Sequence, residues 1–305
     1  MSGFVPTKVL PSGHRIPAVA LGVLQSKPGA EVYNAVLAAL KLGYRHIDTA
    51  DAYENEVDVG RAVHDSGIPR EEVFATTKFY DMSWAPWSTT TAKPWNYQEV
   101  IDAVQESNKK LGLGYIDLYL LHAPALEDMQ AKGVVRDIGV SNFGEQHLTK
   151  LAKTWRVKPA VNQVELHPWL ARADTVKFCQ DQSIVMEAYS PLSRAEKMND
   201  PALLQIASEL DATPAQALVA WSLAKGFVPL PKSVTESRAR KTSLRCVSGG
   251  GSEFGPAYAP RLEGRDSDAT WIGCTPHIGG VQKYSCGSTS AQDLHHTNRM
   301  RHCIL

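Results

Sequence analysis

Residues 43–56 read Gly-Tyr-Arg-His-Ile-Asp-Thr-Ala-Asp-Ala-Tyr-Glu-Asn-Glu and combine three kinds of local structure. Arg45–Thr49 is typical of a short strand with a buried isoleucine and with Asp48 at its end. A polar turn carrying Tyr53 follows, and Glu54 begins a helix. A core favours aliphatic side chains and an exposed turn rarely needs a tyrosine, so Asp48 and Tyr53 are candidates for chemistry. An aspartate that caps the turn, beside a half-buried tyrosine, remains the alternative on this stretch alone.

The order of strand, polar turn and helix repeats along the chain. A hairpin is expected over Lys8–Pro17. Strands are expected at Val19–Leu24, Arg45–Thr49, Val73–Lys78, Tyr115–His122, Asp137–Asn142, Val161–Leu166, Ile184–Ser190 and Val228–Lys232. Helices are expected at Glu31–Leu42, Glu54–Asp65, Tyr97–Leu111, Glu145–Thr154, Ala173–Gln182 and Pro214–Lys225, with about two further turns at Ala125–Lys132.

This alternation predicts parallel strands, and eight of them favour a closed barrel over an open sheet. A doubly wound nucleotide-binding fold is the rival, and it requires Gly-x-Gly-x-x-Gly after an early strand. No such motif occurs there, and Gly249-Gly250-Gly251 comes far too late. We therefore predict an α/β fold, a (β/α)8 TIM barrel preceded by a hairpin.

Composition excludes several classes of protein. The 305 residues carry 32 basic and 32 acidic side chains, so no nucleic-acid surface is indicated. The sequence contains no run of 18 consecutive apolar residues, so no membrane span is expected. The N-terminus lacks the pattern of a secretory signal. The five cysteines are odd in number and four of them lie after residue 240, which fits a reducing compartment better than a disulfide scaffold. We expect a cytoplasmic monomer.

Polar residues recur where the expected strands end. They are Asp48, Lys78, His122, Asn142, Gln163, Tyr189 and Lys232. The carboxyl ends of the strands form the active face of such a barrel. A single polar residue at a strand end is more often structural, but seven in register indicate a site.

Four side chains suggest a device for delivering a proton. Tyr53 is the candidate general acid, and bringing its pKa from about 10 toward neutrality takes about 4 kcal/mol. The ammonium of Lys78 would lower that pKa, Asp48 would hold Lys78 charged, and His122 would orient a carbonyl oxygen. No spacing indicates a metal site. Protonation of an oxygen while hydride reaches its carbon is the remaining chemistry, and it requires a cofactor.

Seven segments in order along residues 8–238 resemble the signature blocks of the aldo-keto reductase family. They are Gly-Tyr-Arg-His-Ile-Asp-Thr-Ala, Thr-Thr-Lys, Tyr-Ile-Asp-Leu-Tyr-Leu-Leu-His-Ala-Pro, Ile-Gly-Val-Ser-Asn-Phe, Asn-Gln-Val-Glu-Leu-His-Pro, Glu-Ala-Tyr-Ser-Pro-Leu and Leu-Pro-Lys-Ser-Val-Thr. The resemblance implies an NADPH-dependent reductase of small aldehydes or ketones. It also implies a catalytic tetrad of Asp48, Tyr53, Lys78 and His122.

The resemblance further implies cofactor-binding positions. Ser141, Asn142 and Gln163 match residues that hold the nicotinamide carboxamide, and Tyr189 matches the aromatic residue stacked on its ring. Ser190 and Leu192 match the turn beside the pyrophosphate. Lys232, Ser233 and Arg238 match the group around the 2′-phosphate, where two cations favour NADPH. Taken alone, Lys232 and Arg238 are more simply the solvated start of a helix.

Two segments before residue 240 depart from the family pattern. The stretch from Asp81 to Tyr97 is longer than usual and is either an aromatic substrate lid or an insertion. With it, Leu24, Tyr80, Trp84 and Trp87 are the candidate substrate pocket. Residues 123–136 barely suffice for a parallel crossover, so the fourth helix is shortened.

The C-terminal part departs further. Residues 241–305 are rich in glycine and scattered histidines, so we expect a reductase domain over 1–240 and a poorly ordered tail, with the eighth helix missing or degraded. Uncovered fourth and eighth strands would then expose aliphatic side chains, at about 25 cal/mol per Å². The alternative function is therefore a protein that binds the cofactor but is catalytically impaired, either a defective gene product or a regulatory module.

Overall fold

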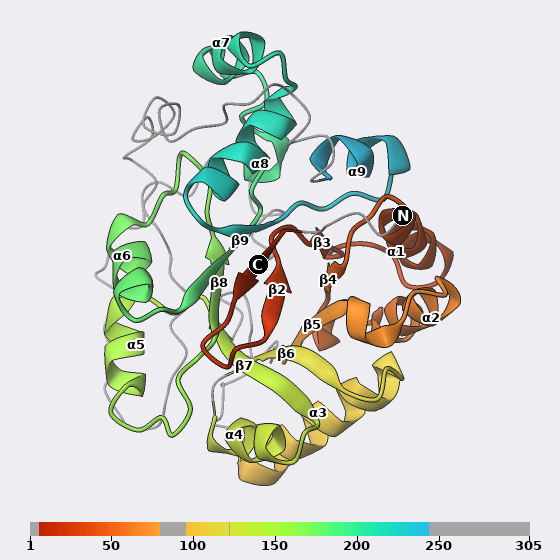
Figure 1. Cartoon of the computed structure of the whole chain (residues 1–305), viewed down its shortest axis with the longest axis vertical. Helices are drawn as coiled ribbons and strands as arrows, with labels where there is room; N and C mark the ends of the chain where they lie inside the picture. Colours follow the sequence, from red (N-terminus) through yellow and green to blue (C-terminus); the bar gives the residue numbers. More distant parts are fainter. Residues whose placement is uncertain (1–5, 80–95, 122, 244–305) are drawn as a thin grey trace, which may run out of the picture. The chain divides into compact units, whose positions relative to one another are not determined.

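Eight parallel strands form the centre of the fold in a computed structural model that describes residues 6–79, 96–121 and 123–243 (Figure 1). All of these residues belong to the first of the two compact units of the chain, Met1–Thr275. The strands are β3 (Leu21–Gly22), β4 (His46–Asp48), β5 (Phe74–Lys78), β6 (Ile116–Leu120), β7 (Val135–Ser141), β8 (Val161–Glu165), β9 (Val185–Tyr189) and β10 (Val228–Leu230).

The strands follow one another in sequence order around the sheet, and each neighbouring pair is parallel. The last strand returns to the first: Gly22 pairs with Lys232, and the N–H of Gly22 donates to the carbonyl of Pro231 at 3.1 Å. The sheet is therefore a closed barrel, and the predicted (β/α)8 fold is confirmed.

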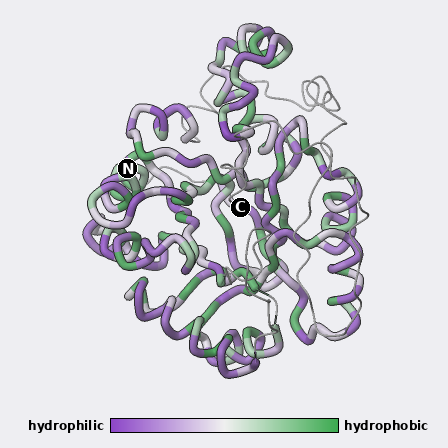
Figure 2. The backbone as a smooth tube through the Cα atoms, turned by 180° about the vertical axis from the view of Figure 1, so that it is seen from behind, coloured by the Kyte–Doolittle hydropathy of each residue, from purple (hydrophilic) through white to green (hydrophobic). Residues whose placement is uncertain are grey.

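Helices surround the strands (Figure 1). They are α1 (Ala30–Lys41), α2 (Glu56–Asp65), α3 (Tyr97–Leu111), α4 (Pro124–Ala131), α5 (Glu145–Leu151), α6 (Ala173–Asp181), α7 (Pro201–Glu209), α8 (Pro214–Ala224) and α9 (Glu236–Thr242). Hydrophilic and hydrophobic residues alternate along most of these helices (Figure 2). Such helices bury one side against the barrel and leave the other in water.

Helix α3 illustrates how local sequence sets these boundaries. The side chain of Asn96 accepts a hydrogen bond from the backbone of Glu99, whose carboxylate accepts one in return. This capping box satisfies backbone donors that a helix start leaves free. At the other end Gly112 adopts a left-handed φ of 62°, which glycine reaches without strain. The helix therefore begins and ends where its sequence predicts.

The predicted hairpin covers the N-terminal end of the barrel. Its strands are β1 (Thr7–Val9) and β2 (Arg15–Pro17), which pair antiparallel. Ile16 packs in the same buried cluster as Leu118 of β6. Nδ1 of His14 lies 2.7 Å from a carboxylate oxygen of the buried Asp137 on β7. The hairpin thus closes the end of the barrel opposite the candidate site.

The shortened fourth helix still covers its strand. Helix α4 buries Ala125, Leu126 and Met129 against the core. Every residue of β6 and β10 is buried. The expectation of exposed aliphatic side chains on the fourth and eighth strands is therefore wrong, because two turns of helix with these side chains suffice beside β6.

Two further differences concern the last third of the chain. The structure contains α7, which the sequence analysis did not predict. The eighth barrel helix is the short α9, and the described residues end at Ser243. Nearly all of the predicted 241–305 tail lies outside the described residues, so its disorder stays a prediction. In the described part of the chain no helix is long and apolar enough to cross a membrane.

Candidate functional site

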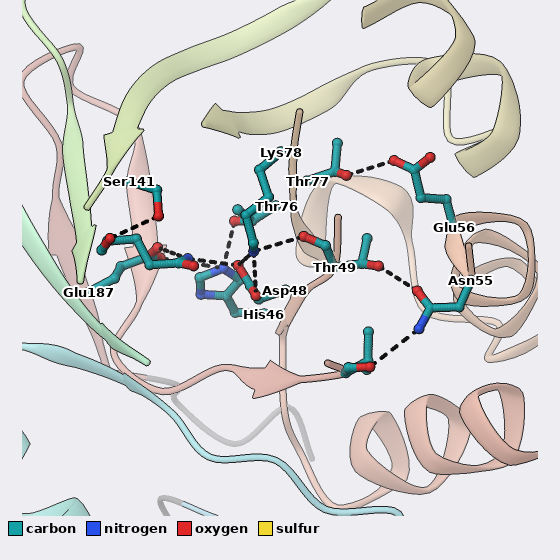
Figure 3. A network of polar contacts seen from close by, with 12 residues as sticks. His46, Asp48, Thr49, Asn55, Glu56, Thr76, Thr77, Lys78, Ser141 and Glu187 are labelled. Carbon is teal, nitrogen blue, oxygen red and sulfur yellow. Dashed lines mark hydrogen bonds and ion pairs between the residues drawn. The ribbon is translucent and has the colours of Figure 1, made fainter. Parts of the chain in front are cut away.

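The ammonium of Lys78 is fixed at the C-terminal end of the barrel (Figure 3). It donates to both carboxylate oxygens of Asp48, at 2.8 and 2.9 Å, and to the carbonyl of Thr49 at 2.9 Å. Asp48 ends β4 and Lys78 ends β5, and both are buried. Because side chains alternate along a strand, the register of these neighbouring strands turns both groups into the barrel.

The surroundings of Lys78 keep it charged. Burial by itself lowers the pKa of this ammonium, but the charges of Asp48 and Tyr53 and the hydrogen bonds to Asp48 outweigh it. The net result is a pKa above the ordinary value of 10.5. A buried lysine with a bonded carboxylate therefore remains a cation at neutral pH.

Tyr53 lies beside this ammonium. It ends the short 3₁₀ turn Asp51–Tyr53, and its ring centre lies 5.4 Å from Nζ of Lys78. Burial raises the pKa of the Tyr53 hydroxyl, the charge of Lys78 lowers it, and Asp48 raises it again. The net direction is upward, so the expected fall of this pKa toward neutrality is not found: burial and the Asp48 carboxylate outweigh Lys78.

A buried asparagine holds the turn that carries Tyr53. The hydroxyl of Thr49 donates to the side-chain oxygen of Asn55 at 2.6 Å. The amide nitrogen of Asn55 donates to the carbonyls of Val23 and Ser26, both at 3.3 Å. These bonds, some of which Figure 3 draws, tie the turn after β4, which carries Tyr53, to the loop after β3.

Several predicted positions lie outside the described residues. They are His122, Tyr80, Trp84 and Trp87. Leu24, the remaining pocket candidate, is half-buried just after β3. The structure therefore brings together three members of the predicted tetrad, Asp48, Tyr53 and Lys78.

The positions expected to hold nicotinamide form a hydrogen-bonded chain. The hydroxyl of Tyr189 donates to the side-chain oxygen of Asn142 at 2.9 Å, and the amide of Asn142 approaches the Ser141 hydroxyl at 3.4 Å. Ser141 in turn donates to the backbone carbonyl of Gln163 at 3.0 Å. The amide nitrogen of Gln163 donates to Asp48 at 2.8 Å. This chain links the candidate cofactor residues to the Asp48–Lys78 pair.

The turn after β9 has an unusual backbone. Ser190, Ser193, Arg194 and Ala195 have left-handed φ values of 47°, 47°, 51° and 65°. In residues other than glycine such conformations are sparsely populated and concentrate at ligand clamps. Ser190 and Leu192, the candidates for the pyrophosphate, are half-buried on this turn.

The candidates for the 2′-phosphate lie just before α9 or within it. Lys232 and Arg238 are exposed cations, and Ser233 is half-buried. The guanidinium of Arg238 donates to the hydroxyl of Thr235 at 2.8 Å, and the hydroxyl of Ser233 donates to the carbonyl of the same residue at 2.9 Å. An aromatic side chain, amide groups and nearby cations suit the ring, the carboxamide and the phosphate of a nicotinamide dinucleotide.

Two buried residues of the site were not predicted. Glu187 on β9 and His46 on β4 have no exposed surface. Burial, followed by the charge of Asp48, raises the pKa of Glu187 to about 8. Burial lowers the pKa of His46 to about 3, so it is neutral. Each lies two residues before a predicted site residue on the same strand, and this spacing could have identified both.

The charged side chains at the barrel mouth are not arranged as a metal site in the described part of the chain. Within residues 6–79, 96–121 and 123–243, no three His, Cys, Asp or Glu side chains gather in a way that could hold a metal ion. The charged groups at the barrel mouth instead contact one another and neighbouring amides (Figure 3).

Comparisons with known proteins place the chain in a family. The model of the aldo/keto reductase family matches residues 19–244. A 9,11-endoperoxide prostaglandin H2 reductase of Trypanosoma cruzi is 40% identical over 240 residues, covering 74% of this chain and 81% of that protein. The glycerol 2-dehydrogenase (NADP(+)) of Saccharomyces cerevisiae is 37% identical over 278 residues, covering 77% and 85%.

A solved structure agrees with these relatives. The aldo-keto reductase of Bombyx mori, in complex with NADP, superposes with a TM-score of 0.70 at 30% identity, covering 85% of this chain and 93% of that one. The barrel, the strand-end side chains and the family match thus point the same way. The chain belongs to the aldo-keto reductase family, a family of oxidoreductases.

Proposed function

We propose that this protein reduces an aldehyde or ketone to an alcohol with NADPH, and that Tyr53 is the general acid. The observation that carries the proposal is the Lys78 ammonium, held by Asp48 and lying 5.4 Å from the Tyr53 ring. A fixed cation beside a phenol has a direct chemical use, because it stabilises the phenolate that remains when the proton leaves.

Each residue then has a defined part in the reaction. Bound NADPH supplies a hydride to the carbonyl carbon. Tyr53 gives its hydroxyl proton to the carbonyl oxygen as negative charge develops there. Its raised pKa keeps it protonated at neutral pH, and a nascent alkoxide is basic enough to take that proton. Lys78 stabilises the resulting phenolate, Asp48 keeps Lys78 charged, and His122 orients the carbonyl.

The choice of NADPH rests on the cations near α9. Lys232 and Arg238 are exposed and lie within one short segment. A 2′-phosphate, absent from NADH, would bind between two such groups. The yeast relative is named for NADP(+), and the silkworm structure was solved with NADP, which supports this choice. We also propose that the protein is a cytoplasmic monomer, which size-exclusion chromatography and cell fractionation test.

Tyr53→Phe tests the catalytic role. The change removes one oxygen, so we expect NADPH oxidation with a simple aldehyde to fall by at least about a hundredfold, since general acid catalysis contributes that much or more. Binding of NADPH, followed by quenching of the fluorescence of the seven tryptophans, should be little altered.

Tyr33→Phe is the matched control. The Tyr33 hydroxyl donates to Asp65 on neighbouring α2 in an exposed contact that includes no candidate site residue, and its loss should leave turnover unchanged. Undiminished turnover in Tyr53→Phe would refute the assignment of the acid. A wild-type chain that quenches with NADPH but reduces no carbonyl would instead support the impaired, cofactor-binding alternative.

A further inference from the structure

The side-chain amide of Gln163 lies between two carboxyl groups. Its Nε2 donates to Oδ2 of Asp48 at 2.8 Å and to Oε2 of Glu187 at 2.7 Å. An amide nitrogen has two hydrogens, so both are used. The reverse orientation would turn the amide oxygen toward both carboxyl groups and lose the bond to Asp48, whose carboxylate oxygens already accept from Lys78. The two carboxyl groups therefore fix which way the amide points.

This orientation leaves the amide oxygen as an acceptor. Among the residues that the structure describes, none donates a hydrogen bond to Oε1 of Gln163. The nicotinamide carboxamide ends in an NH₂ group, which is a hydrogen-bond donor. A Gln163 held in this way offers that group an acceptor, whereas the flipped amide would offer a donor.

The burial of Glu187 at this position lowers the stability of the fold. Its side chain is fully buried, and a buried carboxyl destabilises a fold unless it is well bonded. Oε1 has no hydrogen-bond partner in the described part of the chain, and Nε2 of His46 is 3.7 Å away. An apolar side chain of similar size would fill the same space, but it would leave one N–H of Gln163 without an acceptor. The bond to Gln163 is thus its main specific contact.

We propose that Glu187 is a positioning residue, which together with Asp48 locks the Gln163 amide so that its oxygen accepts from the carboxamide of the bound cofactor. This inference rests on the proposed use of NADPH. The ring of His46, whose Nε2 is hydrogen-bonded to the Thr76 hydroxyl at 2.8 Å, lies 3.7 Å from the other carboxyl oxygen of Glu187. Glu187 touches no reacting atom and acts through Gln163.

Two variants of similar size separate this role from simple space filling. Glu187→Gln keeps an oxygen that can accept from Gln163, whereas Glu187→Met fills the space without one. Each purified protein is titrated with NADPH, with the reduced 3-acetylpyridine analogue, whose NH₂ is replaced by a methyl group, and with 2′-phospho-ADP-ribose, which lacks nicotinamide. Tryptophan fluorescence gives the dissociation constants, and urea unfolding shows that the variants are folded.

The expected pattern is specific to the carboxamide. Wild type should bind NADPH about five- to tenfold more tightly than the acetyl analogue, the range of one lost hydrogen bond. Glu187→Met should lose most of this preference, Glu187→Gln should keep it, and all three proteins should bind 2′-phospho-ADP-ribose alike.

Other outcomes overturn the inference. A Glu187→Met protein with the wild-type preference would show that Asp48 alone orients Gln163, while the proposed function would stand. Equal weakening for all three ligands would also overturn it, because the effect would then be a general one on the fold. A wild-type chain that binds no NADPH overturns the proposed function and this inference together.

Discussion

At the level of a single residue, titration of the Glu187 carboxyl group makes the stability of the fold depend on pH. Burial and the charge of Asp48 raise its pKa from 4.5 to about 8, while the Gln163 hydrogen bond and the charge of Lys78 act in the opposite direction. His46, Asp48 and Lys78 are the titratable groups that face it. Between pH 4.5 and about 8, the unfolded chain releases a proton that the folded chain retains. Folding stability from this group is therefore complete below pH 4.5 and is lost as the pH rises through that window.

Glu187→Gln should remove this dependence, because an amide does not titrate. The free energy of unfolding of wild type, relative to the variant, should fall on the order of a few kcal/mol between pH 5 and pH 8.5. Urea unfolding of both proteins across that range measures the difference. A difference that stays constant with pH would mean that the folded protein carries Glu187 as an ordinary ionised carboxylate.

Sequence reasoning identified the residues of this site more readily than their electrostatics. Asp48 and Lys78 were predictable because each ends an apolar strand, and a barrel gathers strand ends at one mouth. The direction of the Tyr53 pKa was not predictable, since it depends on how deeply the ring is buried and on the distance to Asp48. Glu187 lies in mid-strand rather than at a strand end, and the sequence signal for it is its spacing of two residues from Tyr189 on the same strand.

At the scale of elements, one carboxylate joins α4 to the next part of the barrel. Glu127 accepts from the backbone N–H groups of Arg156 and Val157, at 2.8 and 3.2 Å, and from the Arg156 guanidinium at 2.5 Å. Burial would raise the pKa of Glu127, but these hydrogen bonds outweigh it, and the pKa is lowered. The short helix is thus tied to the loop that precedes β8.

Glu127→Ala should destabilise the protein by about 2 kcal/mol, because it leaves two backbone donors without their partner. The midpoint of urea unfolding at pH 7 measures the loss. Glu106→Ala is the control: this carboxylate is exposed on α3 and forms an exposed ion pair with Lys109, so its removal should change the midpoint little. Equal midpoints for both variants would contradict the role of Glu127.

The boundaries of elements followed local signals where these existed. Helix α3 was predictable because Asn96 and Gly112 mark its ends. Helix α7 carries comparable signals, since Asp200 accepts from the N–H groups of Ala202 and Leu203 and Pro201 occupies the first turn, but they were not read. That the short α4 still covers its strand could not be predicted, because Arg156, to which its Glu127 is hydrogen-bonded, lies far along the chain.

Across the whole barrel, the last helix, α9, is hydrogen-bonded to the segment that follows the first helix, α1. The buried hydroxyl of Tyr44, just after α1, donates to the carbonyl of Ala239 at 3.1 Å and lies 3.0 Å from the hydroxyl of Thr242. Only Ala239 and Thr242 of α9 are buried, so its sequence gives little sign of a helix. Contacts with Tyr44, from the first part of the barrel sequence, hold α9 in place rather than its own helix propensity.

The contact between Tyr44 and α9 should also affect binding of the proposed cofactor, because the proposed 2′-phosphate residues Lys232, Ser233 and Arg238 lie just before or within α9. Tyr44→Phe removes the hydroxyl and should lower the free energy of unfolding by about 1 kcal/mol. It should weaken NADPH binding severalfold more than NADH binding, since only NADPH carries the 2′-phosphate. Titration of tryptophan fluorescence with both cofactors measures this, with Tyr33→Phe as the control. Equal weakening for NADPH and NADH would contradict this prediction. It would mean that α9 does not position the cations proposed to bind the 2′-phosphate, the group that distinguishes the two cofactors.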